Sequence, residues 1–378
     1  MNREKQPGHS PVEQTANPSD PTDPEAAPRF LEELVRQGET AGASDIHLQL
    51  HGGGADIAFR LDGVLAPGRP IPRALAERVV GRIKYLARLK TYQDSLPQDG
   101  RIDHQDLGTR NDLRVATYPA LAGEKVVLRL FQSSSIRSFA ELGIAEPAEA
   151  ELERFLGRTT GLMLLTGPAG SGKTTTIYAC LQRLASAGGR HIITIEDPAE
   201  QLVPGVMQTE VDEPRGLTFA RAARHLLRQD PQVLVIGEIR DEETAGIAVR
   251  AALTGHLVIS TLHAGSCGGV IERLGTLCPD GSAIAASLDL VLNQRLLRRI
   301  CPDCRAKGCD ACLGTGYRGR LPLIEWLRIT DALRPALARR QSADLKAAPA
   351  LADSARALVR SGLTTAVEAR RILGADFT

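Results

Sequence analysis

Four short apolar runs, separated by stretches of helical periodicity, constrain the fold of this chain more than any other feature. They are "GLMLLTG" (161–167), "HIITIED" (191–197), "QVLVIGE" (232–238) and "HLVISTLH" (256–263). Apolar runs without polar alternation, set between helical stretches, are typical of a parallel sheet covered by helices on both faces. The sequence therefore predicts an α/β core, which we place at residues 144–300.

The rest of the chain divides into regions of different character. Residues 29–131 combine helical spacing, strand alternation and an Asp-Gly hairpin turn, which predicts a small α+β domain. Residues 1–28 contain six prolines and almost nothing apolar, which indicates a disordered tail. The other predicted regions are a polar linker at 132–143, a tetracysteine module at 301–320 and a C-terminal helical region at 321–378.

One predicted helix of the α+β domain, residues 73–90, carries basic residues that we expect on its outer face. They are Arg78, Arg82, Lys84 and Arg88. A solvated basic face is one interpretation of this pattern, and contact with a partner protein is the other.

Composition argues against several classes of protein. The net charge is +1 and only 3% of residues are aromatic, which does not suit a nucleic-acid-binding surface. No apolar run approaches the roughly 18–20 residues that span a bilayer. The N-terminus lacks the hydrophobic core of a signal peptide. These features predict a cytoplasmic protein with no specific nucleic-acid partner.

The loop after the first apolar run has the spacing G-x-x-x-x-G-K-[ST] of a phosphate-binding loop. It comprises Gly167, Pro168, Ala169, Gly170, Ser171, Gly172, Lys173, Thr174 and Thr175. Backbone N–H groups in such a loop wrap phosphate oxygens, and the helix that follows adds positive potential. Lys173 is expected to reach the β- and γ-phosphates and Thr174 to bind Mg²⁺. The match lies between a strand and a helix, so it predicts nucleotide binding rather than a glycine-rich turn.

Polar residues follow the other three apolar runs. Glu196 and Asp197 end the second run, Glu238 ends the third and His263 ends the fourth. The carboxyl ends of parallel strands line the ligand crevice of such sheets. A lone carboxylate there can also cap a helix, and a lone histidine can be merely solvated. Convergence on one sheet edge favours a site, in which Glu238 reaches Mg²⁺ directly or through water.

The stretch "CPDCRAKGCDAC" holds four of the seven cysteines in two CxxC pairs. Four thiolates suit tetrahedral zinc, and four intervening residues are enough for the chain to reverse direction. Two pairs around a turn do not suit a redox motif. We predict structural zinc on Cys301, Cys304, Cys309 and Cys312, with a reduced, metal-free loop as the alternative.

Eleven sequence blocks, taken in order, resemble the secretion ATPase superfamily that powers type II secretion and type IV pili. They are "SDIH", "FRLDGVL", "LPQDGRI", "DLRVATYP", "GEKVVLRLF", "GPAGSGKTTT", "ITIEDPAE", "GLTFARAARHLLRQDP", "GEIRDEETA", "TGHLVISTLHAGS" and "GTGYRGR". The resemblance covers about residues 29–330. It implies a RecA-like core, a PAS-like N-terminal domain, Mg²⁺-dependent ATP hydrolysis and a homo-hexamer. Such rings lie on the cytoplasmic side of the inner membrane, peripheral to it, and act through a platform protein.

The resemblance also assigns roles to residues. Glu196 matches the glutamate taken as the base that positions the attacking water, and His263 matches the histidine that senses the γ-phosphate. Glu238 matches the Walker B glutamate. Arginines of the N-terminal domain, here Arg101, Arg114 and Arg129, are expected to neutralise a neighbouring subunit's phosphates. A solvated strand edge or a salt bridge within the domain is the alternative for each arginine.

Several departures from the family pattern qualify these expectations. Long type II enzymes carry a further N-terminal domain that docks on a membrane partner, and this sequence has a proline-rich tail there. Their two CxxC pairs are separated by a larger insertion. The stretch "VMQTEVDEPRG" also departs from the commoner version, and the C-terminal region looks shortened.

Three alternatives to a secretion motor remain open. The first is an assembly motor for a type IV or competence pilus; retraction motors generally lack the four cysteines. The second is a RecA-like nucleic-acid motor, which the composition does not favour. The third is a non-catalytic scaffold, which would need a broken site.

Overall fold

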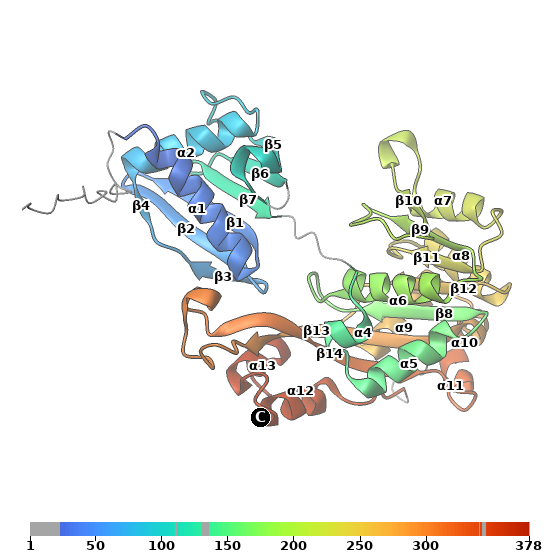
Figure 1. Cartoon of the computed structure of the whole chain (residues 1–378). Coiled ribbons are helices and arrows are strands. Elements are labelled where there is room, and N and C mark those ends of the chain that lie inside the picture. The colour runs from blue at the N-terminus through green and yellow to red at the C-terminus, as the bar shows by residue number, and fades with distance from the viewer. Residues whose placement is uncertain (1–22, 110–111, 131–135, 340, 342–344, 378) are drawn as a thin grey trace, which may run out of the picture. The chain divides into compact units, whose positions relative to one another are not determined.

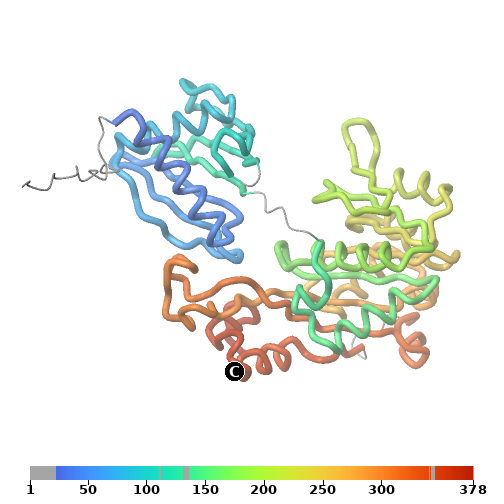
Figure 2. The backbone as a smooth tube through the Cα atoms, viewed as in Figure 1, coloured from blue at the N-terminus to red at the C-terminus, as the bar shows by residue number. Residues whose placement is uncertain are grey.

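The computed structural model describes residues 23–109, 112–130, 136–339, 341 and 345–377. Contacts divide the chain into two compact units. The first comprises Met1–Ser133 with Lys307–Gly316, and the second comprises Ser134–Ala306 with Tyr317–Thr378. Figure 1 labels the elements of both units, and Figure 2 follows the same backbone as a tube.

The N-terminal unit is an antiparallel sheet with two helices packed on one face (Figure 1). The strand order is β3-β2-β1-β7-β6-β5, and β4 pairs with β2. The strands are β1 (Ala43–His51), β2 (Gly54–Leu61), β3 (Val64–Pro67), β4 (Ile71–Pro72), β5 (Gln98–Ile102), β6 (Leu113–Tyr118) and β7 (Lys125–Leu130). The helices are α1 (Ala26–Ala41), α2 (Arg73–Leu86) and the short α3 (His104–Leu107).

Alternation along the strands places the core of this unit. Ile46 and Leu48 of β1 and Ile57 and Phe59 of β2 are at most 4% exposed and pack with apolar residues of α1 and α2. Side chains of a strand point to opposite faces in turn, so the residues between them form the other face. The predicted hairpin is confirmed: Asp62 and Gly63 both have positive φ (50° and 85°), as a two-residue turn of this kind requires.

The expectation that Lys84 lies on an outer basic face is wrong. Its side chain is buried and its ammonium lies 2.7 Å from a Glu124 carboxylate oxygen. The ammonium also donates to the Gln93 carbonyl at 2.8 Å. The sequence shows that Lys84 is basic, but it does not show that Glu124, which immediately precedes β7, is the acidic partner that permits burial.

Two predicted regions fall partly outside the described residues. The tail, predicted at 1–28, is described only from residue 23, and helix α1 begins within it at Ala26. The linker, predicted at 132–143, is described only from residue 136. That part contains helix α4 (Phe139–Leu142), which Ser138 caps by accepting a hydrogen bond from the Glu141 N–H.

The second unit contains the predicted sheet. Its order is β10-β9-β11-β12-β8-β13-β14, and every neighbouring pair is parallel except β13 with β14. The strands are β8 (Gly161–Thr166), β9 (Ile192–Glu196), β10 (Met207–Glu210), β11 (Val233–Ile236), β12 (Leu257–Thr261), β13 (Leu288–Ile300) and β14 (Tyr317–Arg328). The four apolar runs thus form β8, β9, β11 and β12.

Helices cover both faces of this sheet, as the unbroken apolar runs predict. Leu162 and Leu164 of β8 pack in one core cluster, and Met163 and Leu165 pack in another. The first cluster takes in α7 (Phe219–Leu226), α8 (Glu242–Leu253), α9 (Cys267–Leu277), α10 (Gly281–Ser287) and α11 (Arg334–Ala338), and the second takes in α5 (Glu146–Leu156) and α6 (Lys173–Ala187). Figure 1 shows the sheet between these layers.

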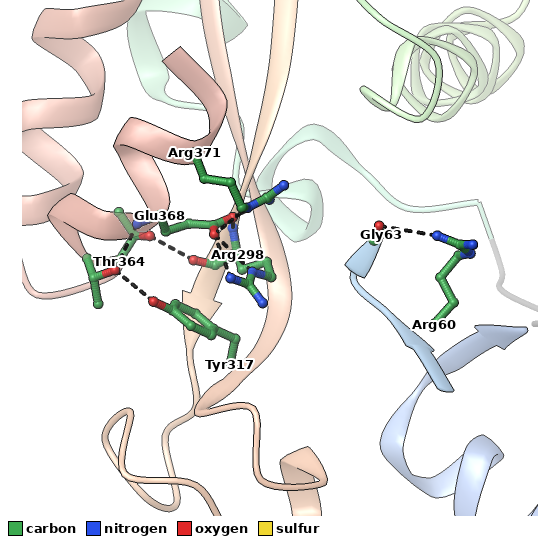
Figure 3. A network of polar contacts seen from close by, with 8 residues as sticks. Arg60, Gly63, Arg298, Tyr317, Thr364, Glu368 and Arg371 are labelled. Carbon is green, nitrogen blue, oxygen red and sulfur yellow. Dashed lines mark hydrogen bonds and ion pairs between the residues drawn. The ribbon is translucent and has the colours of Figure 1, made fainter. Parts of the chain in front are cut away.

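A buried ion network attaches the last helix of the chain to β13. Helices α12 (Leu351–Arg360) and α13 (Ala366–Leu373) pack on β14 and β13 respectively. Glu368 of α13 is 0% exposed and accepts from the Arg298 guanidinium (3.0 and 2.8 Å) and from Arg371 (2.8 and 2.6 Å). Arg298 also lies over the Tyr317 ring, 4.1 Å from its centroid (Figure 3). Among the described residues, no helix is long and apolar enough to cross a membrane.

Candidate active site

The phosphate-binding sequence forms the expected strand–loop–helix unit between β8 and α6. Gly167 and Gly172 have φ of 141° and 87°, which side-chain-bearing residues rarely adopt. A Cβ at Gly167 would lie 2.3 Å from the backbone carbonyl oxygen of Gln294. A Cβ at Gly172 would lie 2.8 Å from the side-chain amide nitrogen of Gln294. Both glycines are therefore required by conformation and by close packing.

Lys173 is the first residue of α6 and is turned back over the loop. Its ammonium donates to the carbonyls of Gly167 (2.9 Å) and Pro168 (3.2 Å). Burial lowers the pKa of Lys173. Thr174 and Thr175, the next two residues, are exposed. The loop thus presents an ammonium and hydroxyl groups at the N-terminus of a helix, which is a suitable environment for phosphate oxygens.

Gln294 supports this loop, and the sequence analysis missed it. The residue lies on β13 and is 2% exposed. Its side-chain amide N–H donates to the Ser171 carbonyl, and its side-chain carbonyl accepts from the Thr176 hydroxyl, both at 2.9 Å. The available signal was "NQR" (293–295), three consecutive polar residues that follow an apolar stretch of the strand.

Arg295, the next residue, connects β13 to the loop that carries His263. Its guanidinium donates to the Asn293 side chain (2.6 Å) and to the Gly265 carbonyl (2.9 Å). Burial lowers the pKa of Arg295. On the same side of the sheet, the Thr166 hydroxyl donates to the Ala264 carbonyl at 2.8 Å. The phosphate loop and the histidine loop are therefore joined at their bases.

The predicted strand-end residues Asp197, Glu238 and His263 are brought together as expected. One Glu238 carboxylate oxygen lies 3.1 Å from His263 Nε2, and the other accepts from Arg240 Nε at 2.8 Å. The same guanidinium donates to Asp197 at 3.2 Å. Arg240 was not predicted, although it stands two residues after Glu238. Its guanidinium therefore pairs with both Asp197, which follows β9, and Glu238, which follows β11.

Glu196, the other residue that ends β9, is in a different environment. It is 7% exposed and accepts hydrogen bonds from Thr194, Gln208 and Tyr178. In the sheet, β9 is separated from the phosphate strand β8 by β11 and β12. A buried carboxylate with several donors is rigidly held, whereas Glu238 lies among charged, partly exposed groups.

The three predicted arginines lie in one row across the N-terminal sheet. Arg101 pairs with Arg114, which pairs with Arg129, and the row continues through Asp45 to Arg60. Arg129 donates to Asp45 at 3.0 Å, and Arg60 lies 3.5 Å from the same carboxylate.

Arg101 forms an ion pair with Asp112 and lowers the pKa of that carboxyl. Salt bridges within the domain, the stated alternative, therefore occur at Arg101 and Arg129. Arg60 was missed because cross-strand register cannot be deduced from the spacing of residues in the chain. Like charges opposite each other in a sheet repel. An anion bound beside Arg101, Arg114 and Arg129 would reduce this repulsion.

The four cysteines between β13 and β14 converge. Their sulfur atoms all lie within 4.8 Å of one another, and none of the four cysteines forms a disulfide. The Cys309 and Cys312 sulfurs are 3.7 Å apart, close to the roughly 3.8 Å separation of two ligands in a tetrahedral zinc–thiolate site. The Gly316 N–H donates to the Cys312 sulfur at 3.2 Å, a contact that stabilises a thiolate. The donor set and its spacing fit a zinc ion.

The amino-acid sequence matches a known family and named relatives. The family model for "Type II/IV secretion system protein" matches residues 21–372. The type II secretion system protein E of Dickeya dadantii is 41% identical over 89% of this chain and 72% of its own length. The type IV pilus assembly ATPase PilB of Thermus thermophilus is 38% identical over 85% of this chain. The match spans only 39% of that protein.

Solved structures share the fold. The pilus retraction motor PilT, solved with bound ADP, is 28% identical and aligns over 90% of this chain and 96% of its own, with a TM-score of 0.61. The ATPase DotB of Yersinia pseudotuberculosis aligns over 97% of this chain and 99% of its own, with a TM-score of 0.69 at 20% identity. At that identity the likeness concerns the fold alone. The resemblance deduced from the sequence blocks is confirmed, and the chain belongs to the type II/IV secretion system protein family.

Proposed function

We propose that this chain is an Mg²⁺-dependent ATP hydrolase that powers pseudopilus assembly and protein export in a type II secretion-like machine. The observation that carries the proposal is that one sheet bears both a phosphate loop and a cluster of charged side chains. A complete phosphate loop leads from β8 into α6 at Lys173. The strands β9, β11 and β12 of the same sheet are followed by the cluster of Asp197, Glu238, Arg240 and His263. The matched relatives bear names from secretion and pilus assembly, which supports the same reading.

Phosphate binding is assigned to residues at the start of α6. Lys173 would exchange its bonds to loop carbonyls for phosphate oxygens, because a charged acceptor makes the stronger hydrogen bond. The exposed Thr174 hydroxyl and the Glu238 carboxylate are hard oxygen donors, which fits Mg²⁺. When bound, Mg²⁺ would neutralise charge on the phosphates. His263, whose Nε2 lies 3.1 Å from a Glu238 carboxylate oxygen, is assigned as the residue that senses the γ-phosphate.

Glu196 is assigned as the base that orients the attacking water. Arg101, Arg114 and Arg129 are assigned to a neighbouring subunit's phosphates in a homo-hexamer. A planar guanidinium matches the charge that spreads over oxygens in phosphoryl transfer. The salt bridges of Arg101 and Arg129 would hold these side chains in defined positions before contact with the nucleotide.

The domain assignment follows the same proposal. Residues 144–300 would form a RecA-like ATPase core and residues 29–131 a PAS-like domain that supplies arginines. Residues 132–143 would link them, and 321–378 would form the C-terminal helical region. Force would pass through a platform protein, with the ring in the cytoplasm and peripheral to the inner membrane.

A type IV or competence pilus assembly motor is the second candidate. The identity to a pilus assembly ATPase is close to the identity to type II secretion proteins (38% and 41%), so similarity alone favours neither strongly. The converging cysteines favour an assembly motor of either kind over a retraction motor. We assign structural zinc to Cys301, Cys304, Cys309 and Cys312.

Hydrolysis by mixed assemblies tests both the site and the arginines. We expect Lys173→Ala and Arg114→Ala each to lower ATP hydrolysis about 10²-fold, because each removes a positive charge from the phosphates. Each shared site takes its loop from one subunit and its arginine from the next. At equal mixing, about one site in four is then complete, and hydrolysis should return to about a quarter of the wild-type rate.

Phosphate release by the two purified variants, alone and after mixing, provides the measurement. Arg69→Ala, at an exposed loop arginine of the N-terminal unit, serves as the matched control and should behave as wild type. Full activity of Lys173→Ala would contradict the site. Failure of the mixture to recover would contradict the shared arginine.

Zinc content provides a separate test. We expect about one equivalent of zinc per chain in the wild type, because four thiolates within bonding reach of one centre bind zinc tightly. Cys301→Ser and Cys312→Ser should each hold much less, and Cys180→Ser, outside the cluster, should match the wild type. Metal analysis of the purified proteins measures this. Less than about half an equivalent in the wild type would refute the four-ligand site.

A further inference from the structure

The Glu196 carboxylate is held by three donors that lie on three elements. Glu196 is the last residue of β9 and is 7% exposed. Oε1 accepts from the Thr194 hydroxyl of β9 (2.6 Å) and from the Gln208 amide of β10 (2.9 Å). Oε2 accepts from the Tyr178 hydroxyl of α6. The carboxyl group therefore cannot rotate without breaking bonds to more than one element.

Tyr178 can serve only as a donor to this carboxylate. Its side chain is 3% exposed, and its hydroxyl oxygen already accepts from the Glu200 N–H at 3.0 Å. A hydroxyl has a single proton, which is left for Glu196. Burial and the adjacent Glu196 carboxylate raise the pKa of Tyr178, so the phenol keeps its proton at neutral pH. Tyr178 lies on the helix that begins at Lys173, five residues further along.

Gln208 is also fixed in one orientation. Its carbonyl oxygen accepts from the Val203 N–H at 2.7 Å. Its amide nitrogen then faces Glu196 Oε1 (2.9 Å) and the Gln201 carbonyl (3.0 Å). A flipped amide would place an oxygen against the carboxylate, and all three bonds would be lost. Gln208 lies within "VMQTEVDEPRG" (206–216), the stretch that departs from the family pattern.

The three donors leave the two carboxylate oxygens in different states. Each carboxylate oxygen offers about two lone-pair directions. Oε1 receives two donors and Oε2 receives one, counting the hydrogen bonds among described residues. A water molecule activated by Glu196 is therefore directed to Oε2, the oxygen that also binds Tyr178.

We propose that Tyr178 and Gln208 are positioning residues for the Glu196 base. They hold the carboxylate so that Oε2 alone accepts the proton of the attacking water. Tyr178 also links this orientation to the helix whose first residue, Lys173, is assigned to the phosphates. The inference rests on the proposed function, because it takes Glu196 as the base. A role in stability alone is the competing explanation for the same bonds.

Steady-state hydrolysis by Tyr178→Phe and Gln208→Ala separates these explanations. Each substitution removes one donor to Glu196 and leaves Lys173 and Glu238 untouched. We expect kcat to fall about tenfold in each and about 10²-fold in the double variant, because a misplaced base reacts more slowly. KM for ATP, and the affinity for a fluorescent ADP analogue, should stay within about twofold. Gln208→Glu, which replaces a donor by an acceptor, should lower kcat more than Gln208→Ala.

Matched controls and a direct comparison make the outcome decisive. Tyr85→Phe and Gln105→Ala, at exposed positions of the N-terminal unit, should match the wild type. Melting temperatures are measured for all variants, and if Tyr178→Phe is unstable, Gln208→Ala decides the question. A kcat within twofold of wild type, or a fall in kcat matched by weaker ADP binding, overturns the positioning role. So does a Gln208→Glu variant as active as Gln208→Ala.

Glu196→Gln distinguishes failure of this inference from failure of the proposed function. If Glu196→Gln loses hydrolysis while Tyr178→Phe and Gln208→Ala keep it, the base stands and the positioning role is wrong. If the wild type does not hydrolyse ATP, the proposed ATPase activity is wrong. If Glu196→Gln remains fully active, the assignment of Glu196 as the base is wrong.

Discussion

Replacing Glu238 by glutamine is expected to lower ATP hydrolysis about 10³-fold while nucleotide binding is retained. The carboxylate lies 3.1 Å from His263 Nε2 and accepts a hydrogen bond from Arg240 Nε at 2.8 Å, and an amide of the same shape cannot supply its charge. Without that charge, the assigned Mg²⁺ ligand is lost, and Arg240 keeps Asp197 as a charged partner but loses its ion pair with Glu238. Lys173 and the phosphate loop are unchanged, so the effect should fall on kcat.

Phosphate release and binding of a fluorescent ADP analogue measure the two properties separately. Glu242→Gln, at an exposed position in the first turn of α8, removes the same charge four residues away and should match the wild type. Hydrolysis by Glu238→Gln within tenfold of wild type would contradict the assignment of Glu238. Equal loss of hydrolysis and of ADP binding would show damage to the whole site instead.

Replacing Glu368 by alanine should destabilise the second unit by about 3–5 kcal/mol. Glu368 is 0% exposed and is the shared acceptor for Arg298 and Arg371. Although burial alone acts to raise it, hydrogen bonds from these two arginines lower the pKa of Glu368 overall. The carboxylate is thus stabilised in its charged form, and its removal leaves the largely buried Arg298 without that counter-charge. For a unit of this size, the expected fall in melting temperature is about 6–20 °C.

The sign of the pH dependence follows from the lowered pKa of Glu368. Its stabilising effect is complete above the pKa of a glutamate in the unfolded chain, and it is lost as the pH falls through the lower folded value. The difference in stability between wild type and Glu368→Ala should therefore shrink in acid. Asp353→Asn, which breaks the exposed Asp353–Arg356 pair on α12, is the matched control and should cost about 0.5 kcal/mol or less. Thermal unfolding that does not distinguish Glu368→Ala from this control would contradict the network's role.

The sequence predicts best the features that depend on short-range patterns. Unbroken apolar runs identified β8, β9, β11 and β12, and the glycine spacing located the phosphate loop. The carboxyl ends of parallel strands lie together by geometry, which is why Glu238 and His263 could be expected to meet. The converging cysteines were predicted from their spacing alone.

Features that depend on distant partners were not predictable in the same way. Gln294 lies 123 residues from Ser171, and no local pattern connects them. Tyr178 looks like an ordinary core residue of an apolar helix face, and its contact with Glu196 appears only when α6 packs on the sheet. Buried polar residues need partners, but the sequence does not show which residue supplies each one.

The long strand β13 also bears on how sequences of this kind can change in length. Gln294 and Arg298 lie four residues apart without a bulge between them, so their side chains point to the same face. A one-residue insertion between them would turn the phosphate-loop support and the anchor of the last helix to opposite faces. The segment 301–316 lies beyond the paired part of β13 and β14. The cysteine loop can therefore change in length between its two CxxC pairs without shifting this register, whereas a one-residue deletion or insertion between Gln294 and Arg298 would disturb both the active site and the attachment of the C-terminus.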